Sequence, residues 1–118
     1  MPAPVEQFTN DGLTFDVTDT GAPDGRAVIL LHGFPEDRAC WSAVGSRLAG
    51  AGYRALAPDQ RGYSPGARPE GRSAYKVSSL TGDILALADA AGCDRFDVVG
   101  HDWGGGVAWD LAARHPGL

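Results

Sequence analysis

The chain has 118 residues and a formal net charge of −5, and hydrophobic residues make up 43% of it. This content suits a globular core, and the acidic balance argues against nucleic acid or an anionic membrane as a partner. No apolar run approaches the roughly 18 residues of a membrane-spanning helix, and residues 1–6 lack the features of a signal peptide. The two cysteines, Cys40 and Cys93, form no disulfide framework and predict reduced thiols in the cytoplasm.

Two strands are expected at the start of the chain, over residues 5–9 and 13–18. The second alternates apolar and polar side chains, which is typical of a half-exposed strand near the edge of a sheet. A turn rich in Gly, Pro and Asp follows, and residues 27–31 then form a continuous apolar run. Such a run predicts a strand that is buried on both faces of a parallel sheet.

Helices and strands alternate in the rest of the chain. Apolar residues at helical spacing predict helices over residues 41–48 and 77–91, and a last helix is expected over 107–113. Short, mostly apolar runs predict strands over residues 53–57 and 95–99, and a long polar loop follows the first of them. Three successive βα units favour an α/β fold with a mostly parallel sheet and flanking helices.

Each βα unit has a distinctive loop after its strand. The three loops are His32-Gly33-Phe34-Pro35, Asp59-Gln60-Arg61-Gly62-Tyr63-Ser64 and Gly100-His101-Asp102-Trp103-Gly104-Gly105. Ligands of open α/β sheets bind beyond the carboxyl ends of the strands, so the three loops are expected to converge. In the first loop, Gly33 lets the backbone approach closely and the Phe34 amide point into a site. In the second, Asp59 and Arg61 are expected to pair and hold the loop.

The third loop has the pattern of a nucleophile elbow, a sharp turn between a strand and a helix around one reactive side chain. Its common form is G-x-S-x-G, and here Asp102 replaces the serine. A dinucleotide fingerprint would need Gly at that position, and no G-K-[ST] follows, so both phosphate-binding loops are excluded. A metal site of His32, His101 and Asp102 is a weaker alternative, because no helical His pair or H-E-x-x-H supports it. No metal and no cofactor is therefore expected.

The order and spacing of the three loops, between residues 32 and 105, resemble the α/β-hydrolase superfamily. Within it, the chain resembles the epoxide hydrolases, with the haloalkane dehalogenases as close relatives. The resemblance implies that Asp102 is the nucleophile and that the backbone N–H groups of Phe34 and Trp103 form an oxyanion hole. It also implies a cis Phe34–Pro35 bond and substrate contacts from Trp103 and Pro35.

An aspartate nucleophile implies attack at a saturated carbon, which forms an alkyl ester on the enzyme. Water then attacks the carboxyl carbon of Asp102, so we expect the intact protein to hydrolyse a small-molecule epoxide to a diol. Phe34 favours this branch, because many haloalkane dehalogenases have Asn at that position. A haloalkane dehalogenase is the alternative enzyme, and a truncated, non-catalytic binding domain is the alternative of another class.

The family also requires a histidine and an acid after the nucleophile. Asp110 and His115 follow Asp102 but lie on the last expected helix. At a rise of about 1.5 Å per residue, His115 would be roughly 20 Å from the elbow. Residues 1–118 are therefore expected to be the N-terminal portion of an α/β-hydrolase core domain, truncated after the elbow helix. Without the cap domain, the later strands, the catalytic histidine and its acid, this portion alone is expected to be inactive.

Two further expectations concern packing around the elbow. Relatives pair another strand beside the elbow strand, so residues 95–99 are expected at an open sheet edge although their apolar character suits burial. Gly106 stands where relatives often have Ala. It either weakens the first helical turn by up to about 1 kcal/mol or permits closer packing of the helix on the strand.

Overall fold

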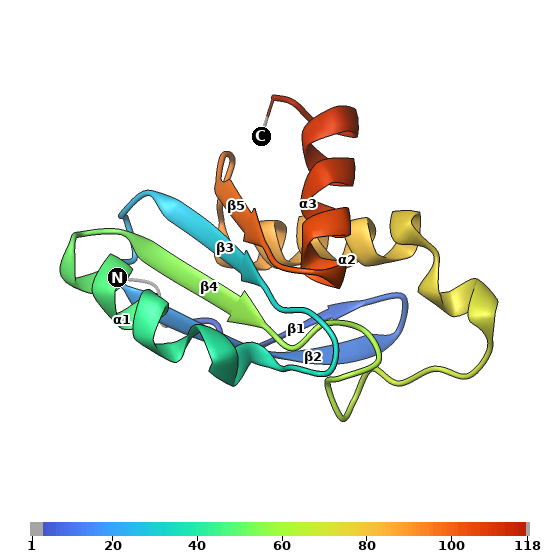
Figure 1. Cartoon of the computed structure of the whole chain (residues 1–118). Helices are drawn as coiled ribbons and strands as arrows, with labels where there is room; N and C mark the ends of the chain where they lie inside the picture. Colours follow the sequence, from blue (N-terminus) through green and yellow to red (C-terminus); the bar gives the residue numbers. More distant parts are fainter. Residues whose placement is uncertain (1–3, 118) are drawn as a thin grey trace.

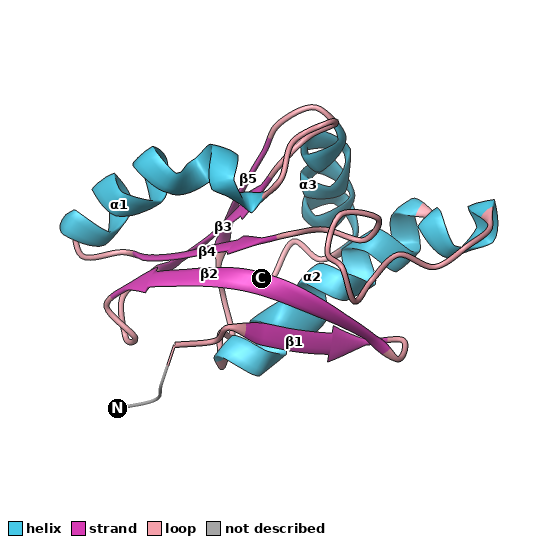
Figure 2. Ribbon diagram, turned by 90° about the horizontal axis from the view of Figure 1, so that it is seen from below, coloured by secondary structure: helices cyan, strands magenta, loops and turns pink. Residues whose placement is uncertain are grey.

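The computed structural model describes residues 4–117 and shows one five-stranded mixed sheet with helices on both faces (Figures 1 and 2). The strands are β1 (Gln7–Asn10), β2 (Leu13–Gly21), β3 (Ala27–Leu31), β4 (Arg54–Pro58) and β5 (Asp97–Gly100). Their spatial order is β1-β2-β4-β3-β5. The β1–β2 and β2–β4 pairs are antiparallel, whereas β3 runs parallel to β4 and β5. The expected α/β fold is thereby confirmed.

The helices form two layers around the sheet. They are α1 (Ser42–Gly50), α2 (Val77–Ala91) and α3 (Trp103–Arg114), with short 3₁₀ helices η1 (Arg38–Trp41) and η2 (Arg72–Tyr75). Helix α1 covers one face, while α2 and α3 lie on the other (Figure 2). Within residues 4–117, no helix has the length and apolarity needed to cross a bilayer.

Strand β3, which lies between β4 and β5, contributes to two hydrophobic cores. Because successive residues of a strand point to opposite faces, Val28 and Leu30 pack on the α1 side, while Ile29 and Leu31 enter the larger core with α2 and α3. All five β3 residues are buried, as the unbroken apolar run predicts. This strand therefore anchors the loop that follows it.

Most elements lie within one or two residues of the bounds predicted from the sequence, and two, α3 and β2, differ by more. The strand over 27–31 and the helix over 77–91 are confirmed without change. Helix α3 begins at Trp103 and not at 107; its first turn contains three glycines, whose poor helix propensity hides this turn from the sequence pattern. Strand β2 extends to Gly21 and lies between β1 and β4, so the outer strand on that side is β1.

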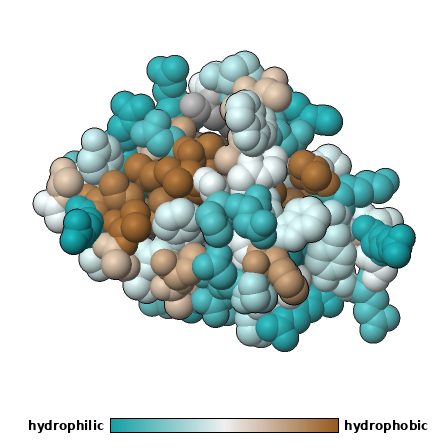
Figure 3. Space-filling model, viewed as in Figure 1, coloured by the Kyte–Doolittle hydropathy of each residue, from teal (hydrophilic) through white to brown (hydrophobic). Residues whose placement is uncertain are grey.

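Strand β5 forms the other edge of the sheet, as expected. It pairs with β3, and no strand in residues 4–117 covers its outer side. Val99 of β5 is 44% exposed and Trp109 of the adjoining α3 is 79% exposed. The strand is thus less buried than its apolar residues suggest, and the space-filling view shows a hydrophobic patch open over the sheet (Figure 3).

We expect the 118-residue chain on its own to aggregate or to melt without a cooperative transition. The reason is that an open apolar edge offers unpaired backbone groups to other chains. Light scattering combined with a thermal melt followed by circular dichroism will check this. A monomer with one cooperative transition would contradict the expectation.

Candidate active site

Asp102 lies in a sharp turn between β5 and α3. Its backbone has φ 57° and ψ −118°, and it occupies the N-cap position of α3. A positive φ at a residue other than glycine stores strain, typically about 1–3 kcal/mol, and such strain clusters at functional sites. The side chain is exposed to solvent, so its carboxylate is open to a ligand.

Glycines around Asp102 make the turn possible. A Cβ atom added to Gly100 would collide with the carbonyl group of Gly104, and one added to Gly104 would collide with the carbonyl group of Leu31. A Cβ atom on Gly33 would collide with the side chain of Asp102 itself. The elbow therefore packs backbone against backbone, and this geometry brings the loop after β3 against Asp102.

The first and third loops meet at the carboxylate of Asp102, as the sequence predicts. The backbone N–H of Phe34 donates a hydrogen bond of 3.1 Å to Asp102 Oδ2. The Phe34–Pro35 peptide bond is cis, as expected. Trp103 is the first residue of α3, where backbone N–H groups have no partner inside the helix.

His32 fastens the first loop to the second from inside the protein. It is fully buried, and its Nε2 accepts a hydrogen bond of 3.1 Å from the backbone N–H of Gln60. Its Nδ1 lies 3.1 Å from the carbonyl oxygen of Gly33, which assigns the ring proton to Nδ1. The Gln60 side chain donates to the His32 carbonyl oxygen at 2.7 Å.

The metal alternative finds no support in this arrangement. Both ring nitrogens of His32 are engaged, and the exposed His101 has its Nδ1 3.3 Å from Glu36 Oε1. Across residues 4–117, no group of three His, Cys, Asp or Glu side chains is placed to hold a metal ion.

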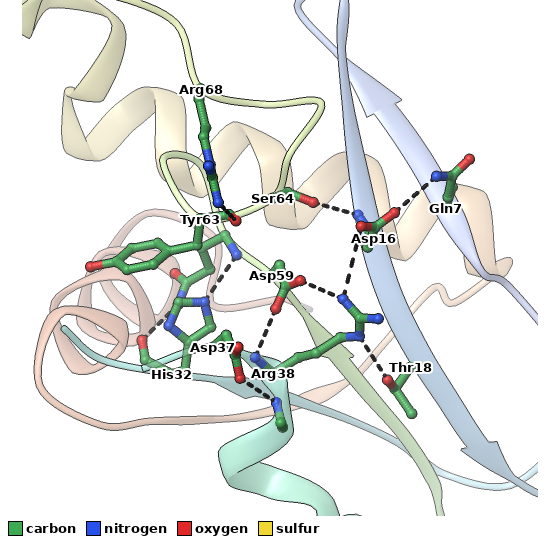
Figure 4. A network of polar contacts seen from close by, with 12 residues as sticks. Gln7, Asp16, Thr18, His32, Asp37, Arg38, Asp59, Tyr63, Ser64 and Arg68 are labelled. Atoms are coloured by element: carbon green, nitrogen blue, oxygen red, sulfur yellow. Dashed lines mark hydrogen bonds and ion pairs between the residues drawn. The ribbon is translucent and has the colours of Figure 1, made fainter. Parts of the chain in front are cut away.

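The second loop is held in place, but the expected pairing of Asp59 with Arg61 is wrong. Asp59 pairs with Arg38, whose guanidinium also reaches toward Asp16 (Figure 4). Arg61 instead donates to Asp83 of α2, with hydrogen bonds of 2.6 and 2.9 Å. Each residue therefore finds a partner on another element, and these long-range pairs fix the loop against the rest of the core.

A cavity of about 430 Å³ lies beside the elbow. Its lining includes Phe34 and Trp103, which flank Asp102 and are both 65% exposed. The expected contact from Trp103 is compatible with this position. Pro35 is exposed and does not line this cavity, so the structure gives no support to its expected substrate contact.

The cavity is also lined by residues to which the sequence assigns no role in a site. These are Tyr75 of η2 and Leu80 of α2, which line it together with Tyr63 and other parts of the second loop. Burial raises the pKa of the Tyr63 phenol, and the negative charge of Asp102 raises it further. Tyr63 is therefore neutral at pH 7, and it lies within electrostatic reach of the carboxylate.

The acidic and histidine residues after Asp102 lie away from the elbow, as expected. Asp110 accepts a 2.6 Å hydrogen bond from the Thr81 hydroxyl and pairs with Arg114 at 2.8 Å. It therefore links α3 to α2. His115 caps the far end of α3. Neither side chain meets the carboxylate of Asp102 in this arrangement.

The sheet order, the elbow and the loop beside it define the class of protein. Residues 26–118 match the family described as alpha/beta hydrolase fold, and the chain belongs to this family.

The similar proteins include epoxide hydrolases. Epoxide hydrolase A of Mycobacterium tuberculosis is 44% identical over 116 residues, which cover 98% of this chain and 36% of that protein. An AB hydrolase superfamily protein of Bacillus subtilis is 45% identical over 111 residues, or 93% of this chain and 39% of that protein. The crystal structure of epoxide hydrolase A from Mycobacterium thermoresistibile matches with a TM-score of 0.90 at 36% identity, covering 97% of this chain and 36% of that chain. The chain thus spans less than two fifths of these relatives' length.

Two glycines in the first turn of α3 give a matched test of the elbow packing. Space around a Cβ atom on Gly106 is open, so this glycine does not serve closer packing on the strand. We expect Gly106→Ala to raise the free energy of unfolding by up to about 1 kcal/mol. Gly104→Ala should lower it by about 3 kcal/mol, because the methyl group meets the backbone of β3. Urea melts of each variant, with this chain joined to the further part of the fold that the longer relatives have, will check both, and equal effects would contradict the packing.

Proposed function

We propose that this chain is part of an enzyme that hydrolyses epoxides to diols through an alkyl ester on Asp102. The observation that carries the proposal is the strained, exposed Asp102 with its Oδ2 bonded to the Phe34 N–H. A carboxylate presented in this way can attack a saturated carbon. The epoxide hydrolases among the relatives support the same substrate class.

The hydrogen bond from Phe34 assigns different roles to the two carboxylate oxygens. Oδ2 is held by the N–H group, so Oδ1 is the atom that attacks the epoxide carbon. The carbon–oxygen bond of the ring breaks, and the epoxide oxygen leaves as an alkoxide that takes up a proton. The complete protein would need a donor for that proton, and the resemblance to epoxide hydrolases implies two tyrosines of a cap domain in this role.

The second step regenerates Asp102. Water, deprotonated by a histidine base, attacks the carboxyl carbon, and negative charge develops on Oδ2. The N–H groups of Phe34 and Trp103 would stabilise this oxyanion, and one such donor is typically worth about 3 kcal/mol in rate. Collapse of the intermediate breaks the bond between the carboxyl carbon and the alkyl oxygen, which takes the proton from the histidine and leaves as the diol.

A haloalkane dehalogenase is the second candidate function. The observation in its favour is Trp103, whose side chain lines the cavity and can offer an indole N–H to a halide. Phe34 favours the epoxide reaction, because many haloalkane dehalogenases have Asn at that position. The two reactions differ in their products, because the dehalogenase releases a halide ion and a single alcohol.

We also propose that residues 1–118 form a partial hydrolase core that is inactive alone. The histidine base, its acid and the leaving-group donors are needed from outside this stretch, and the relatives are more than twice as long. If the chain acts by itself, its alternative function is that of a non-catalytic binding domain. We propose a cytoplasmic location, which the free thiols of Cys40 and Cys93 support.

An isotope experiment tests the covalent mechanism in the complete protein, meaning this chain joined to the part of the fold that the relatives have beyond it. Excess enzyme is mixed with an epoxide in H₂¹⁸O for a single turnover. We expect a diol without ¹⁸O, because its two oxygens come from the epoxide and from Asp102. The label should appear in the peptide that contains Asp102. A diol labelled in the first turnover would show direct attack by water and refute the ester.

A further inference from the structure

One wall of the cavity beside Asp102 has no role in the proposed reaction. It consists of Tyr63, Tyr75 and Leu80, which belong to the second loop, to η2 and to α2. Of the residues that line the cavity, the proposed reaction uses only Phe34 and Trp103, which flank the carboxylate. A cavity of about 430 Å³ is large enough for part of a small ligand besides its reacting atoms.

Tyr75 is fixed in this wall by two contacts. Its ring packs against Gly62, where an added Cβ atom would lie 3.1 Å from Tyr75 Cε1. Gly62 has a φ of 94°, a conformation that favours glycine. The Tyr75 hydroxyl donates a 2.7 Å hydrogen bond to the carbonyl oxygen of Pro69. Because this polar group is satisfied by the backbone, Tyr75 contributes its ring to the cavity.

Buried charges hold the segment that carries Tyr75. The guanidinium of Arg61 donates a 2.8 Å hydrogen bond to the carbonyl oxygen of Ala74, the residue before Tyr75. Arg61 is itself held by Asp83 and Asp11. The wall is therefore positioned before a ligand arrives, which lowers the entropy cost of binding.

The wall also offers no free charge to a ligand. The Arg61 guanidinium is used by its carboxylate partners, and Tyr63 is a neutral phenol, whose pKa burial and the charge of Asp102 raise above its ordinary value. The Tyr63 ring is fixed edge-on against His32, with ring centroids 4.7 Å apart at 84°. Four aromatic side chains, those of Phe34, Tyr63, Tyr75 and Trp103, thus line the cavity, and the charged carboxylate of Asp102 lies beside it.

We propose that this cavity binds an uncharged aryl substituent of the epoxide and that Tyr75 determines the preference for it. Flat aromatic groups pack well on aromatic walls, in stacked or edge-to-face geometry. An anionic substituent would meet the negative charge of Asp102 without a compensating cation. This inference rests on the proposed function, because the reacting carbon must reach Asp102 while the ring occupies the cavity.

The test compares two terminal epoxides that differ only in this substituent, styrene oxide with a phenyl group and propylene oxide with a methyl group. The ratio of their kcat/KM values is measured in the complete protein. Tyr75→Ala removes the aromatic wall, and Leu80→Trp fills the cavity from α2, so that one variant suffices if the other fails to fold. We expect the ratio of styrene oxide to propylene oxide to fall about tenfold in each.

Tyr53→Ala is the matched control. The chain has three tyrosines, and Tyr53 precedes β4 at the other end of the sheet. Activity and the substrate ratio should be unchanged in this variant. An unaltered ratio in the folded cavity variants, or equal losses on both substrates, would overturn the inference while leaving the proposed function intact. Failure of the parental enzyme to convert either epoxide would instead refute the proposed function and, with it, this inference.

Discussion

Asp102→Asn will abolish the alkyl ester and lower epoxide turnover by at least about 10⁴-fold in the complete protein, as expected for loss of a nucleophile. Asparagine has the same shape as aspartate and retains one oxygen for the N–H of Phe34, so the elbow should keep its geometry. The neutral amide, however, cannot displace the epoxide oxygen from carbon. The change therefore separates the chemistry of Asp102 from its place in the fold.

Mass spectrometry gives the most direct measurement of this loss. In a protein that lacks the histidine base, the ester should accumulate and add the mass of the epoxide to the peptide containing Asp102. The same protein with Asp102→Asn should show no addition. Asp110→Asn is the matched control and should still give the adduct. Asp110 lies on α3, the helix that Asp102 caps, but it contacts Thr81 and Arg114. An adduct that persists in Asp102→Asn would mean that another residue is the nucleophile.

The sequence predicts the elements that have a clear hydrophobic pattern. Strand β3 and helix α2 have their predicted bounds, because an unbroken apolar run and a helical period each identify one kind of element. The start of α3 has no such pattern. Glycines at 104–106 disfavour a helix locally, and the close contact of Gly104 with the backbone of β3 explains why one of them is needed there.

The candidate site also has features that the sequence predicts and features that it does not. The contact between Phe34 and Asp102 follows from topology, because the carboxyl ends of parallel strands meet at one edge of a sheet. The partners of Arg61 and the place of Tyr75 depend on contacts between distant segments, and no local spacing encodes them. Only the composition of the loop indicates such partners, because an arginine inside a glycine-rich loop needs buried partners if the loop packs into the core.

Replacing Arg61 by methionine should cost the complete protein about 3–5 kcal/mol of its free energy of unfolding. The side chains of Arg61 and Asp83 are only 4% and 3% exposed, so the change leaves a buried carboxylate without its cation. Arg26→Met is the matched control, since Arg26 pairs with Asp97 at the surface, where the side chains are 70% and 45% exposed. A surface pair of this kind is worth at most about 1 kcal/mol. Urea melts of both variants at neutral pH will measure the difference.

A second change, Asp83→Asn, identifies the cause of the loss. Asparagine keeps an oxygen for the amide of Asn10, which donates to Asp83 at 2.8 Å, and removes the uncompensated charge. The double variant Arg61→Met, Asp83→Asn should therefore be more stable at neutral pH than Arg61→Met alone. Recovery will be incomplete, because Arg61 also holds Asp11 and the carbonyl oxygen of Ala74. A double variant that is no more stable than Arg61→Met would contradict this account.

The pH dependence of these variants follows from the pKa of Asp83. Burial raises this pKa above its ordinary value, and the hydrogen bond and charge of Arg61 oppose the rise. Without Arg61 the pKa in the folded protein should rise further. A carboxyl with a raised folded pKa favours folding while it is protonated, and that stability is lost as the pH increases through the folded pKa. The stability gap between Arg61→Met and the double variant should therefore widen from about pH 4 to pH 7, and a gap independent of pH would show that lost packing, and not the buried charge, destabilises the protein.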